Sequence, residues 1–499
     1  MQGRMRMTPS LRKELWRTPD LLGFAAHWTW IWCVFWSSLF YAEGTLLNSS
    51  ESAGAAAGLS TIALEPLWVT SLLANVVTIA FLLLLSYLRN PLSDVRCLPV
   101  LAAALTALGT LAISHPSLVM TGGGASTVYL AGSLLTGVGS GIVVVLWAEL
   151  LASLGSQRTV NYSVAALLLA AVAYLVISLL PIDAAQMIVA LLPLISMGCF
   201  VHFKRSVPRP PRAMRNVRVR AVPPMRMMVI AAFFGVSFGV MKGLIAPVGD
   251  EWIGVRDQLN IIAIAGGALA AFVAMSVCKM DFDHLTYQIA LPLMAAGFLF
   301  LPMHEPWNVI GTAVHQLGYQ YFYIVLWALW PVLASHGSVP TGWVVGWGLL
   351  CIQLGQFVGS VAAAIALTFV QGDLGLAMVS AGVIFVILII ALFAMGSGSA
   401  NTGWGFVKPM EEADAASDFE KAGTRLARRC RLSPREIEVF FLLAKGRNRA
   451  YIREELVIGD ETVKSHIKSI YRKADVHSQQ ELIDLLERES SAGEPRGRG

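Results

Sequence analysis

The amino-acid sequence predicts an all-α protein with about twelve transmembrane helices in two six-helix halves, followed by a small four-helix domain at the C-terminus. Two observations lead to this fold class. The 499 residues are 56% hydrophobic and only 14% charged, with a mean hydropathy of +0.63, whereas soluble proteins carry about 25% charged residues. The segment Leu432 to Leu486 departs from this composition, because it is polar, charged and patterned as helices.

Apolar runs of about 20 residues are long enough to cross a bilayer. The chain contains about twelve of them, centred on 21–42, 68–88, 98–114, 126–149, 160–180, 184–203, 227–247, 258–278, 285–303, 308–333, 342–369 and 375–396. Only Pro181-Ile182-Asp183 separates the fifth run from the sixth, and the eleventh is long and rich in Gly. Counts of eleven and thirteen therefore stay open.

The positive charges indicate how the helices are oriented. Lys and Arg gather in the N-terminus and in alternate loops, above all in the middle loop, whereas residues 43–67, 115–125, 181–183 and 370–374 contain neither. Cytoplasmic loops are enriched in these residues. The alternation favours an even number of spans in the inner (cytoplasmic) membrane, with both termini in the cytoplasm.

These features divide the chain into seven segments. They are a cytoplasmic basic N-terminus at 1–20, a first six-helix membrane half at 21–203, a basic Pro-rich cytoplasmic loop at 204–226, a second six-helix half at 227–396, a flexible acidic linker at 397–430, a DNA-binding domain at 431–488 and a disordered tail at 489–499. The six-plus-six arrangement resembles the major facilitator superfamily in general shape over about residues 20–397. The glycine-rich motif of that family is not visible in the second–third loop, which reads YLRNPLSDVRCLP.

A short repeated motif is consistent with repeated halves. The fourth run contains IVVVLWA at 142–148 and the tenth contains IVLWA at 324–328. These two runs would be equivalent helices if the halves repeat. A chance match in such apolar sequence is the alternative.

The C-terminal segment carries the signals of a helix-turn-helix. Ser433 and Glu436 form a capping box around Pro434, which suits the first helical position. A second short helix follows, and a third begins near Asp460, with Val463, Ile467 and Ile470 facing inward and a basic outer face. Two short helices joined by a Gly-containing turn, the second with a basic face, are typical of DNA binding in the major groove. A solvated basic helix is the alternative.

The motifs L-S-P-R-E-x-E-V at 432–439 and T-V-K-x-H at 462–466 resemble those of the LuxR-type (NarL/GerE) DNA-binding domain. The resemblance implies that Lys464, Ser465 and Lys468 contact bases of promoter duplex DNA. It also implies that a fourth helix, about 478–487, pairs two copies into a homodimer. The remaining predicted DNA-binding residues lie near phosphates or on the same basic face, and they are Thr462, Arg447, Asn448 and Arg472.

The segment departs from that family at a few positions. Gly459 replaces the usual Ser cap of the third helix, and Asp460 is an alternative cap one residue later. Ala474-Asp475 replaces the usual Leu-Gly, and Gln479 stands where an Arg is frequent. These changes bear on stability and dimer geometry rather than on the DNA-contacting face.

The membrane part has few charges that could couple ions. Glu149 and Lys242 lie near the ends of their runs, where such side chains are expected to reach the interface. Polar and aromatic residues are more plentiful and predict a pocket for a small-molecule effector. The candidate ligand contacts are His315, Tyr319, Tyr323, Gln353, Gln356 and Trp32. The alternatives are Trp belts at the interface and Gln as a hydrogen bond between helices.

No motif predicts an enzyme, a cofactor or a metal site. The six cysteines are scattered singly, and no phosphate-binding glycine loop or nucleophile elbow is present. The sequence predicts a membrane-embedded one-component transcriptional regulator whose partners are promoter DNA, the lipid bilayer and an unknown small molecule. A transporter whose DNA-binding tail tunes its own expression is the alternative, and a tail that serves only to dimerise is a third.

Overall fold

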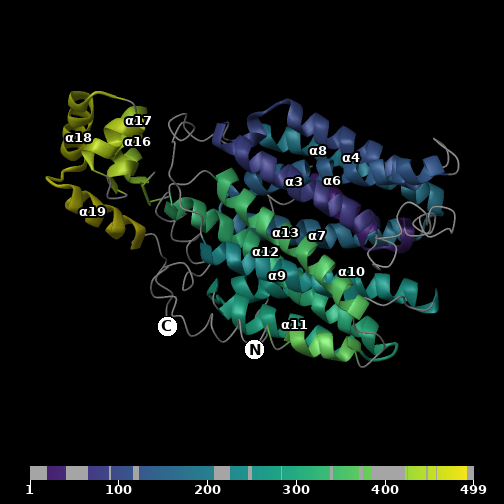
Figure 1. Ribbon diagram of the computed structural model, residues 1–499. Coiled ribbons are helices and arrows are strands. Elements are labelled where there is room, and N and C mark those ends of the chain that lie inside the picture. Colours follow the sequence, from purple (N-terminus) through teal and green to yellow (C-terminus); the bar gives the residue numbers. More distant parts are fainter. Residues whose placement is uncertain are drawn as a thin grey trace. The chain divides into compact units, whose positions relative to one another are not determined.

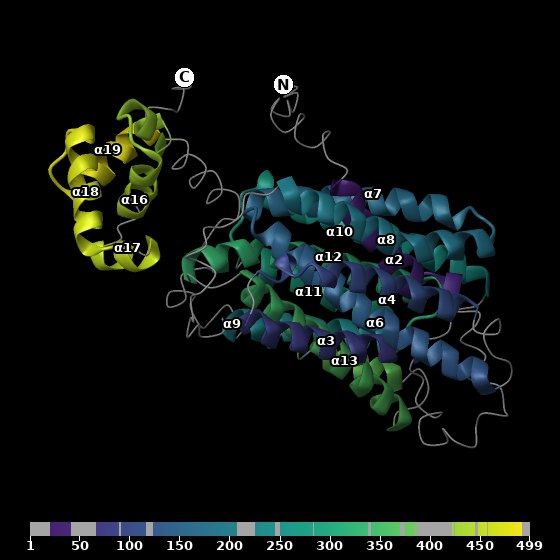
Figure 2. The same ribbon diagram turned by 90° about the horizontal axis from the view of Figure 1, so that it is seen from above.

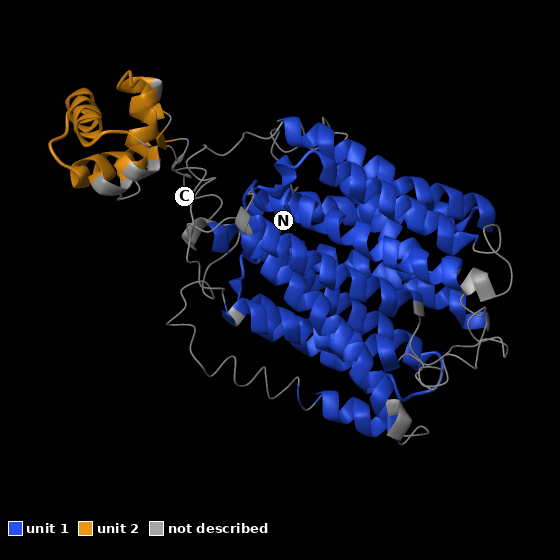
Figure 3. Ribbon diagram, turned by 45° about the horizontal axis from the view of Figure 1, so that its top comes forward, with its two compact units in different colours: residues 1–208, 219–409 blue, residues 209–218, 410–499 orange. Residues whose placement is uncertain are grey.

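The computed structural model describes residues 20–40, 66–88, 91–115, 123–206, 225–244, 250–282, 284–337, 341–369, 375–384, 386, 422–423, 425–444, 448–456 and 458–491. These residues form helices and no strand, which confirms the all-α fold class. They fall into two compact units (Figure 3). The first unit holds the apolar helices and the second holds the C-terminal ones.

The first unit is a bundle of long helices that lie side by side (Figures 1 and 2). Its helices are α2 (Asp20–Phe35), α3 (Pro66–Leu88), α4 (Cys97–Ser114), α6 (Gly123–Ala152), α7 (Ser156–Ser178), α8 (Ile182–Ser206), α9 (Met225–Leu244), α10 (Asp250–Ser276), α11 (Leu291–Phe300), α12 (Trp307–Gly337) and α13 (Thr341–Phe369). The π-helix η5 (His284–Ala290) leads into α11, and short 3-10 turns stand at η1 (Ser38–Phe40) and η3 (Leu92–Asp94).

The bundle has the properties of a multi-pass membrane protein. Within the described residues, nine helices are long and apolar enough to span a bilayer, and the shorter apolar helices are Leu21–Phe35, His284–Phe300 and Gly375–Ile384. A helix thus lies in each of the twelve predicted ranges, but the exact count of twelve stays a prediction. On α3, Val77, Phe81 and Leu84 are exposed by 61, 62 and 66%. Such a stripe suits contact with lipid rather than water.

The two halves meet through symmetric helix pairs. Helix α3 packs against α13, and α7 packs against α10. In each pair the second helix of one half meets the fifth helix of the other half. This reciprocity is what a pseudo-two-fold relation between repeated halves produces.

Glycines allow the closest helix contacts within the bundle. A Cβ atom on Gly355 or Gly359 of α13 would collide with carbonyl oxygens of α9, and one on Gly235 or Gly239 of α9 would collide with carbonyl oxygens of α13. Gly137 of α6 lies in the same way against α3. Small residues are the usual means by which membrane helices approach one another.

Glu149 is a buried structural residue and does not reach the interface as expected. It is 3% exposed, and its two carboxylate oxygens accept the backbone N–H groups of Leu92 and Ser93 at 3.1 and 2.8 Å. Lys204 lies 3.0 Å from the Asp94 carboxylate in the same loop. The end of α6 and the end of α8 are therefore both tied to the turn η3.

The second unit contains α16 (Pro434–Ala444), α17 (Arg449–Leu456), α18 (Asp460–Ala474) and α19 (Gln479–Ser491). This arrangement confirms the predicted four helices, although α19 runs four residues beyond its expected end at Glu487. The unit has its own hydrophobic core, in which Phe440, Val463, Ile470 and Leu482 are fully buried.

Residues before the predicted start of this domain also belong to its core. Ala422 and Leu426 are buried in the same cluster. Nearby, the Arg429 guanidinium pairs with the Glu489 carboxylate of α19 at 2.8 Å. The packed structure therefore includes described residues from Ala422 onward, nine positions before residue 431.

The helix starts show which caps the chain uses. The Glu436 N–H donates to Ser433 Oγ at 3.3 Å and the Ser433 N–H donates to Glu436 Oε2 at 2.6 Å, which confirms the capping box. At α18 the cap residue is Gly459, with extended backbone and no side-chain hydrogen bond. The alternative that Asp460 caps this helix is wrong, because Asp460 is already its first residue.

Glu436 joins α16 to α18. Its carboxylate also accepts hydrogen bonds from Ser469 Oγ and from Lys473 Nζ, each at 2.6 Å. Burial by itself raises the pKa of Glu436, but the hydrogen bonds from Lys473, Ser469 and Ser433 outweigh it and lower this pKa to about 2. The ionised carboxylate therefore stabilises the fold.

We expect Glu436→Gln to lower the unfolding free energy of a 420–499 fragment by about 2–3 kcal/mol at pH 7. The folded pKa lies below the ordinary value of 4.5, so the stabilisation is complete above that pH and is lost as the pH falls toward about 2. Urea unfolding at pH 7 and pH 3 measures the difference. Glu438→Gln is the matched control, since Glu438 is exposed and pairs with exposed Arg435. An equal loss in both variants would contradict the assignment.

We expect Asp475→Gly to stabilise the same fragment by about 0.5–1 kcal/mol. Asp475 ends α18 with φ of 55° and ψ of 50°, a left-handed conformation that Gly adopts without strain. Asp484→Gly, in the interior of α19, should instead destabilise the fragment by about 1 kcal/mol. Thermal unfolding of both variants checks the contrast, which would fail if both shifted the same way.

Candidate functional site

The exposed face of α18 carries the residues predicted to meet DNA. Val463 and Ile470 anchor the helix in the core, while Thr462, Lys464, Ser465, Lys468 and Arg472 are exposed. Lys464, Lys468 and Arg472 recur every four residues and so form one stripe along the helix. The stripe is a continuous positive surface, and the opposite face of the same helix is packed into the core.

The other two predicted residues lie near the turn before α17. Asn448 is exposed immediately before α17, and Arg447 lies outside the described residues. Arg449, the first residue of α17, lies 3.8 Å from the Asp460 carboxylate. The start of α17 is therefore next to the start of α18, so that Asn448 borders the basic face.

Acidic residues stand at the N-terminal end of that face. Lys464 Nζ lies 3.5 Å from Glu461 Oε1, and both side chains are exposed. An exposed pair of this kind contributes little to stability, so that Lys464 can exchange it for a contact with DNA. Gln479, which stands where an Arg is frequent, donates to the Leu443 carbonyl at 2.9 Å and so closes the end of α16.

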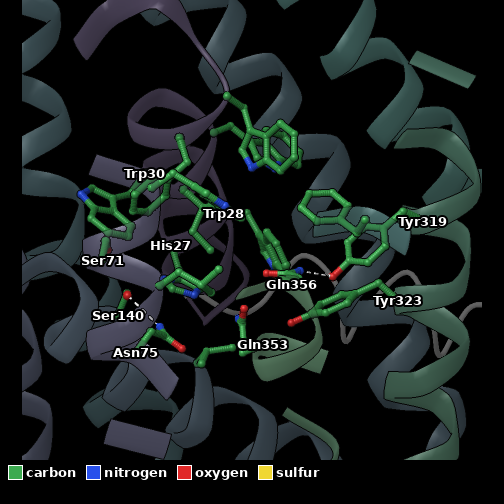
Figure 4. Close-up of a pocket in the computed structure, with 18 of the residues that line it drawn as sticks. His27, Trp28, Trp30, Ser71, Asn75, Ser140, Tyr319, Tyr323, Gln353 and Gln356 are labelled. Carbon is green, nitrogen blue, oxygen red and sulfur yellow. Dashed lines mark hydrogen bonds between the residues drawn. The ribbon is translucent and has the colours of Figure 1, made fainter. Parts of the chain in front are cut away.

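The membrane unit contains a cavity between its two halves (Figure 4). The walls come from α2, α3 and α6 of the first half and from α9, α12 and α13 of the second. Its volume, counted as the space open to the centre of a water molecule, is about 100 Å³. That is room for several waters or one small molecule, since a single water needs about 10–15 Å³ by this measure.

Five predicted ligand contacts line this cavity. They are Trp32, Tyr319, Tyr323, Gln353 and Gln356. The Gln356 amide donates to the Tyr319 hydroxyl at 2.5 Å, so that these two side chains are fixed relative to each other. The sixth residue does not reach the cavity.

His315 borders a smaller adjoining hollow instead, together with Lys242 and Thr312. Its Nε2 lies 3.4 Å from Ser237 Oγ on α9. The sequence places His315 on the same helix face as Tyr319. Phe238 lines both hollows, and its ring centroid lies 4.1 Å from that of Tyr319.

The sequence prediction missed several wall residues. Asn75 and Ser140 line the cavity from α3 and α6, and Asn75 Nδ2 donates to Ser140 Oγ at 3.0 Å. His27 and Trp28 belong to an aromatic cluster that the sequence does show, whereas single polar residues on α3 and α6 give no signal before the helices are assembled. Gln316, Gln320 and Phe238 also line the cavity from the second half.

Aromatic rings close the bundle beyond one end of the cavity. Phe24 lies between Trp147 of the first half and Trp327 of the second, with ring centroids 5.3 and 5.2 Å away. These are the two tryptophans of the short repeated motif at 142–148 and 324–328. Their symmetric contacts support repeated halves over a chance match. At the other end of α2, Trp36 packs against Phe238 of the second half at 5.2 Å.

No group of three or more His, Cys, Asp or Glu in the described part of the chain could hold a metal ion. The arrangement offers a positive helix face and a lined cavity.

Comparisons with known proteins agree with both units. Residues 431–486 match the family described as "Bacterial regulatory proteins, luxR family". The HTH-type transcriptional activator RamA of Corynebacterium glutamicum is 36% identical over 64 residues, which are 13% of this chain and 23% of RamA. The match thus spans about a quarter of that relative's length.

Solved structures resemble the membrane unit in fold alone. The human organic anion transporter MFSD10 (TETRAN) aligns with a TM-score of 0.54 and 15% identity, over 77% of this chain and all of that one. The proton:xylose symporter XylE gives 0.54 and 12%, over 75% and 94%. A bacterial homologue of the iron transporter ferroportin gives 0.52 and 11%, over 76% and 97%.

The two sets of observations converge. The helices of the second unit, with their capping box and basic α18, form a LuxR-family helix-turn-helix domain. The first unit is a multi-pass membrane bundle with the fold of major facilitator superfamily transporters. One chain therefore joins a regulatory DNA-binding domain to a transporter-like membrane fold.

Proposed function

We propose that the protein is a membrane-embedded one-component transcriptional regulator. The cavity in its membrane unit binds a small-molecule effector, and its C-terminal domain binds promoter DNA. The observation that carries the proposal is the presence of a LuxR-family helix-turn-helix in the same chain as a transporter-like bundle. Both termini then lie in the cytoplasm, because DNA is accessible only on that side of the inner membrane.

The exposed face of α18 supplies the DNA contacts. Lys464, Ser465 and Lys468 lie where a helix in the major groove meets base edges, and Lys can donate to guanine. Arg472, Thr462 and Asn448 lie further along the same surface and contact phosphates, together with Arg447. Phosphate contacts orient the domain, and base contacts select the sequence.

The effector acts by favouring one arrangement of the two halves. A ligand shifts a conformational equilibrium only through a difference in its affinity for the two states. The cavity meets this requirement, because both halves contribute to its wall and any movement between them changes the contacts of a bound molecule.

The segment that leads into the DNA-binding unit contacts α19, the proposed dimerisation helix. Residues 422–431 lead into α16, and Arg429 of this segment pairs with Glu489 of α19. We propose that α19 pairs two copies on DNA. A change transmitted along the linker then reaches α19 directly and alters pairing.

We expect a 420–499 fragment to bind the promoter duplex of its own gene or of a neighbouring gene. Lys464→Ala and Lys468→Ala should each weaken binding by about 1–3 kcal/mol and reduce the slope of affinity against salt by about one. Fluorescence anisotropy across a salt series measures both effects. The start at residue 420 retains Ala422 and Leu426 in the core.

Arg435→Ala is the matched control for these variants. Arg435 is exposed on α16 and pairs with Glu438. The substitution therefore removes one positive charge at a position outside α18. The proposal fails if the fragment binds no duplex at low salt. It also fails if Arg435→Ala weakens binding as much as Lys464→Ala does.

A transporter with an autoregulatory tail is the second candidate, and the fold of the membrane unit favours it. Ion-coupled transport generally relies on ionisable groups inside the membrane, and no Asp, Glu, Lys or Arg among the described residues lines the cavity. We therefore expect proteoliposomes to show no concentrative uptake of a compound that alters promoter output. Uptake that survives deletion of residues 410–499 would establish the transporter instead.

A further inference from the structure

The cavity of the membrane unit is lined without a charged side chain. Within the part of the chain that the structure describes, its wall contains aromatic, amide, hydroxyl, imidazole and aliphatic groups, and no Asp, Glu, Lys or Arg. A charged ligand would lose its hydration there without gaining an ionic partner, which is strongly unfavourable. The wall therefore selects for an uncharged molecule.

The ammonium group of Lys242, which lies next to the cavity wall, already has partners. Lys242 donates to the Phe35 carbonyl at 3.1 Å, and its ammonium lies 4.7 Å from the ring centroid of Trp36 and 5.5 Å from that of Trp68. Both indoles line the cavity. The positive charge therefore lies against two of the rings that line the cavity and is stabilised by them.

Four polar atoms of the wall have no hydrogen-bond partner among the described residues. They are His27 Nε2, Trp28 Nε1, Asn75 Oδ1 and Gln320 Nε2. Each of these residues is less than 9% exposed. An unsatisfied buried polar atom costs free energy, so that a molecule that meets several of them gains the corresponding hydrogen bonds.

Their convergence is what distinguishes the cavity. Indole nitrogens of Trp330 and Trp347 elsewhere in the bundle also have no hydrogen-bond partner in the described part of the chain. A single bare indole therefore does not mark a site. The cavity instead gathers an imidazole, an indole and two amides from α2, α3 and α12.

The hydrogen-bonding character of the wall follows from its other contacts. Asn75 Nδ2 is used by Ser140 Oγ, which leaves Asn75 Oδ1 as an acceptor. Trp28 and Gln320 offer N–H donors. The Tyr319 hydroxyl accepts from Gln356, which leaves its hydrogen for a ligand. The matching molecule carries at least one acceptor and one donor.

We propose that the cavity binds an uncharged, single-ring molecule that carries both a hydrogen-bond acceptor and a donor, as an amide does. The inference rests on the proposed effector site and specifies its ligand. The ring packs among the aromatic walls around Trp36, Phe238 and Tyr319, in the space of about 100 Å³. The polar group meets Asn75 on one side and Trp28 or Gln320 on the other.

A matched set of probes tests the charge requirement. Benzamide, benzoate and benzamidine have nearly the same shape but are neutral, negative and positive at pH 7. Quenching of tryptophan fluorescence, with isothermal titration calorimetry as a second readout, measures their binding to the full-length protein in lipid nanodiscs. We expect saturable binding of benzamide and at least tenfold weaker binding of the two ions.

Two variants test the polar contacts. Asn75→Leu removes the acceptor at similar volume, and Trp28→Phe removes the indole N–H but keeps a ring. Each should weaken benzamide binding about tenfold. The control is Asn161→Leu, the same substitution on α7 at a residue that does not line the cavity, and it should leave binding unchanged. Thermal unfolding in the same nanodiscs verifies that each variant is folded.

Three results would overturn the inference. The first is an absence of saturable benzamide binding up to about 10 mM. The second is equal or tighter binding of either ion, and the third is binding by the two variants that equals that of the wild type. Benzoate binding that disappears in Lys242→Met would assign an anion site instead. These measurements use no DNA, so that promoter binding by the 420–499 fragment can succeed while the ligand class fails, and the two failures are distinguishable.

Discussion

The inability of hydrocarbon to form hydrogen bonds is the constraint on which the membrane unit depends. Polar side chains must be satisfied inside the bundle, and hydroxyls do so by bonding back to their own helices. Thr106 donates to the Ala102 carbonyl and Thr110 to the Thr106 carbonyl, each at 2.7 Å. Lipid also supplies no hydrophobic force between helices, so that close packing must hold them together. Glycines provide it by bringing α9 and α13 into backbone contact. Several unsatisfied polar atoms that line one cavity then indicate a place where a ligand binds.

The second unit is built under the opposite condition. Water solvates the charges of α18, and a small core anchored by Phe440, Val463 and Ile470 holds the helix in place. The Glu436 carboxylate fixes α16 to α18 by accepting from Ser469 and Lys473. The residues that hold the helix are thus distinct from those that it presents, so that the basic face can vary without loss of the fold.

Much of this organisation could be predicted from local sequence patterns. The capping box, the buried face of α18 and the apolar runs depend on residues close together in the chain. The cavity was only partly predictable, since Tyr319 and Tyr323 share a helix face, whereas Asn75 of α3 lines the same cavity only once the bundle is assembled. Glu149 was misjudged because its partners are the backbone N–H groups of a turn 56 and 57 residues away. The segment around Leu426 follows an acidic linker, and its place in the core depends on contacts that the local sequence does not show.

The joining of the two units in one chain restricts where the DNA-binding domain can act. A soluble regulator reaches its operator by diffusion, whereas a domain tethered to a bilayer meets only DNA that comes to the membrane. The linker therefore limits both the search and the change that the bundle can transmit. Because the chain enters the second unit beside Glu489 of α19, any transmitted change arrives at the helix proposed to pair two copies.

The most direct measurement is promoter occupancy by the intact, membrane-embedded protein in cells that carry its gene. Chromatin immunoprecipitation from the membrane fraction should recover discrete promoter fragments with the full-length chain and lose them in a Lys464→Ala, Lys468→Ala double variant of equal abundance. Recovery of the same fragments by the double variant, or no enrichment by the full-length chain, would contradict the account.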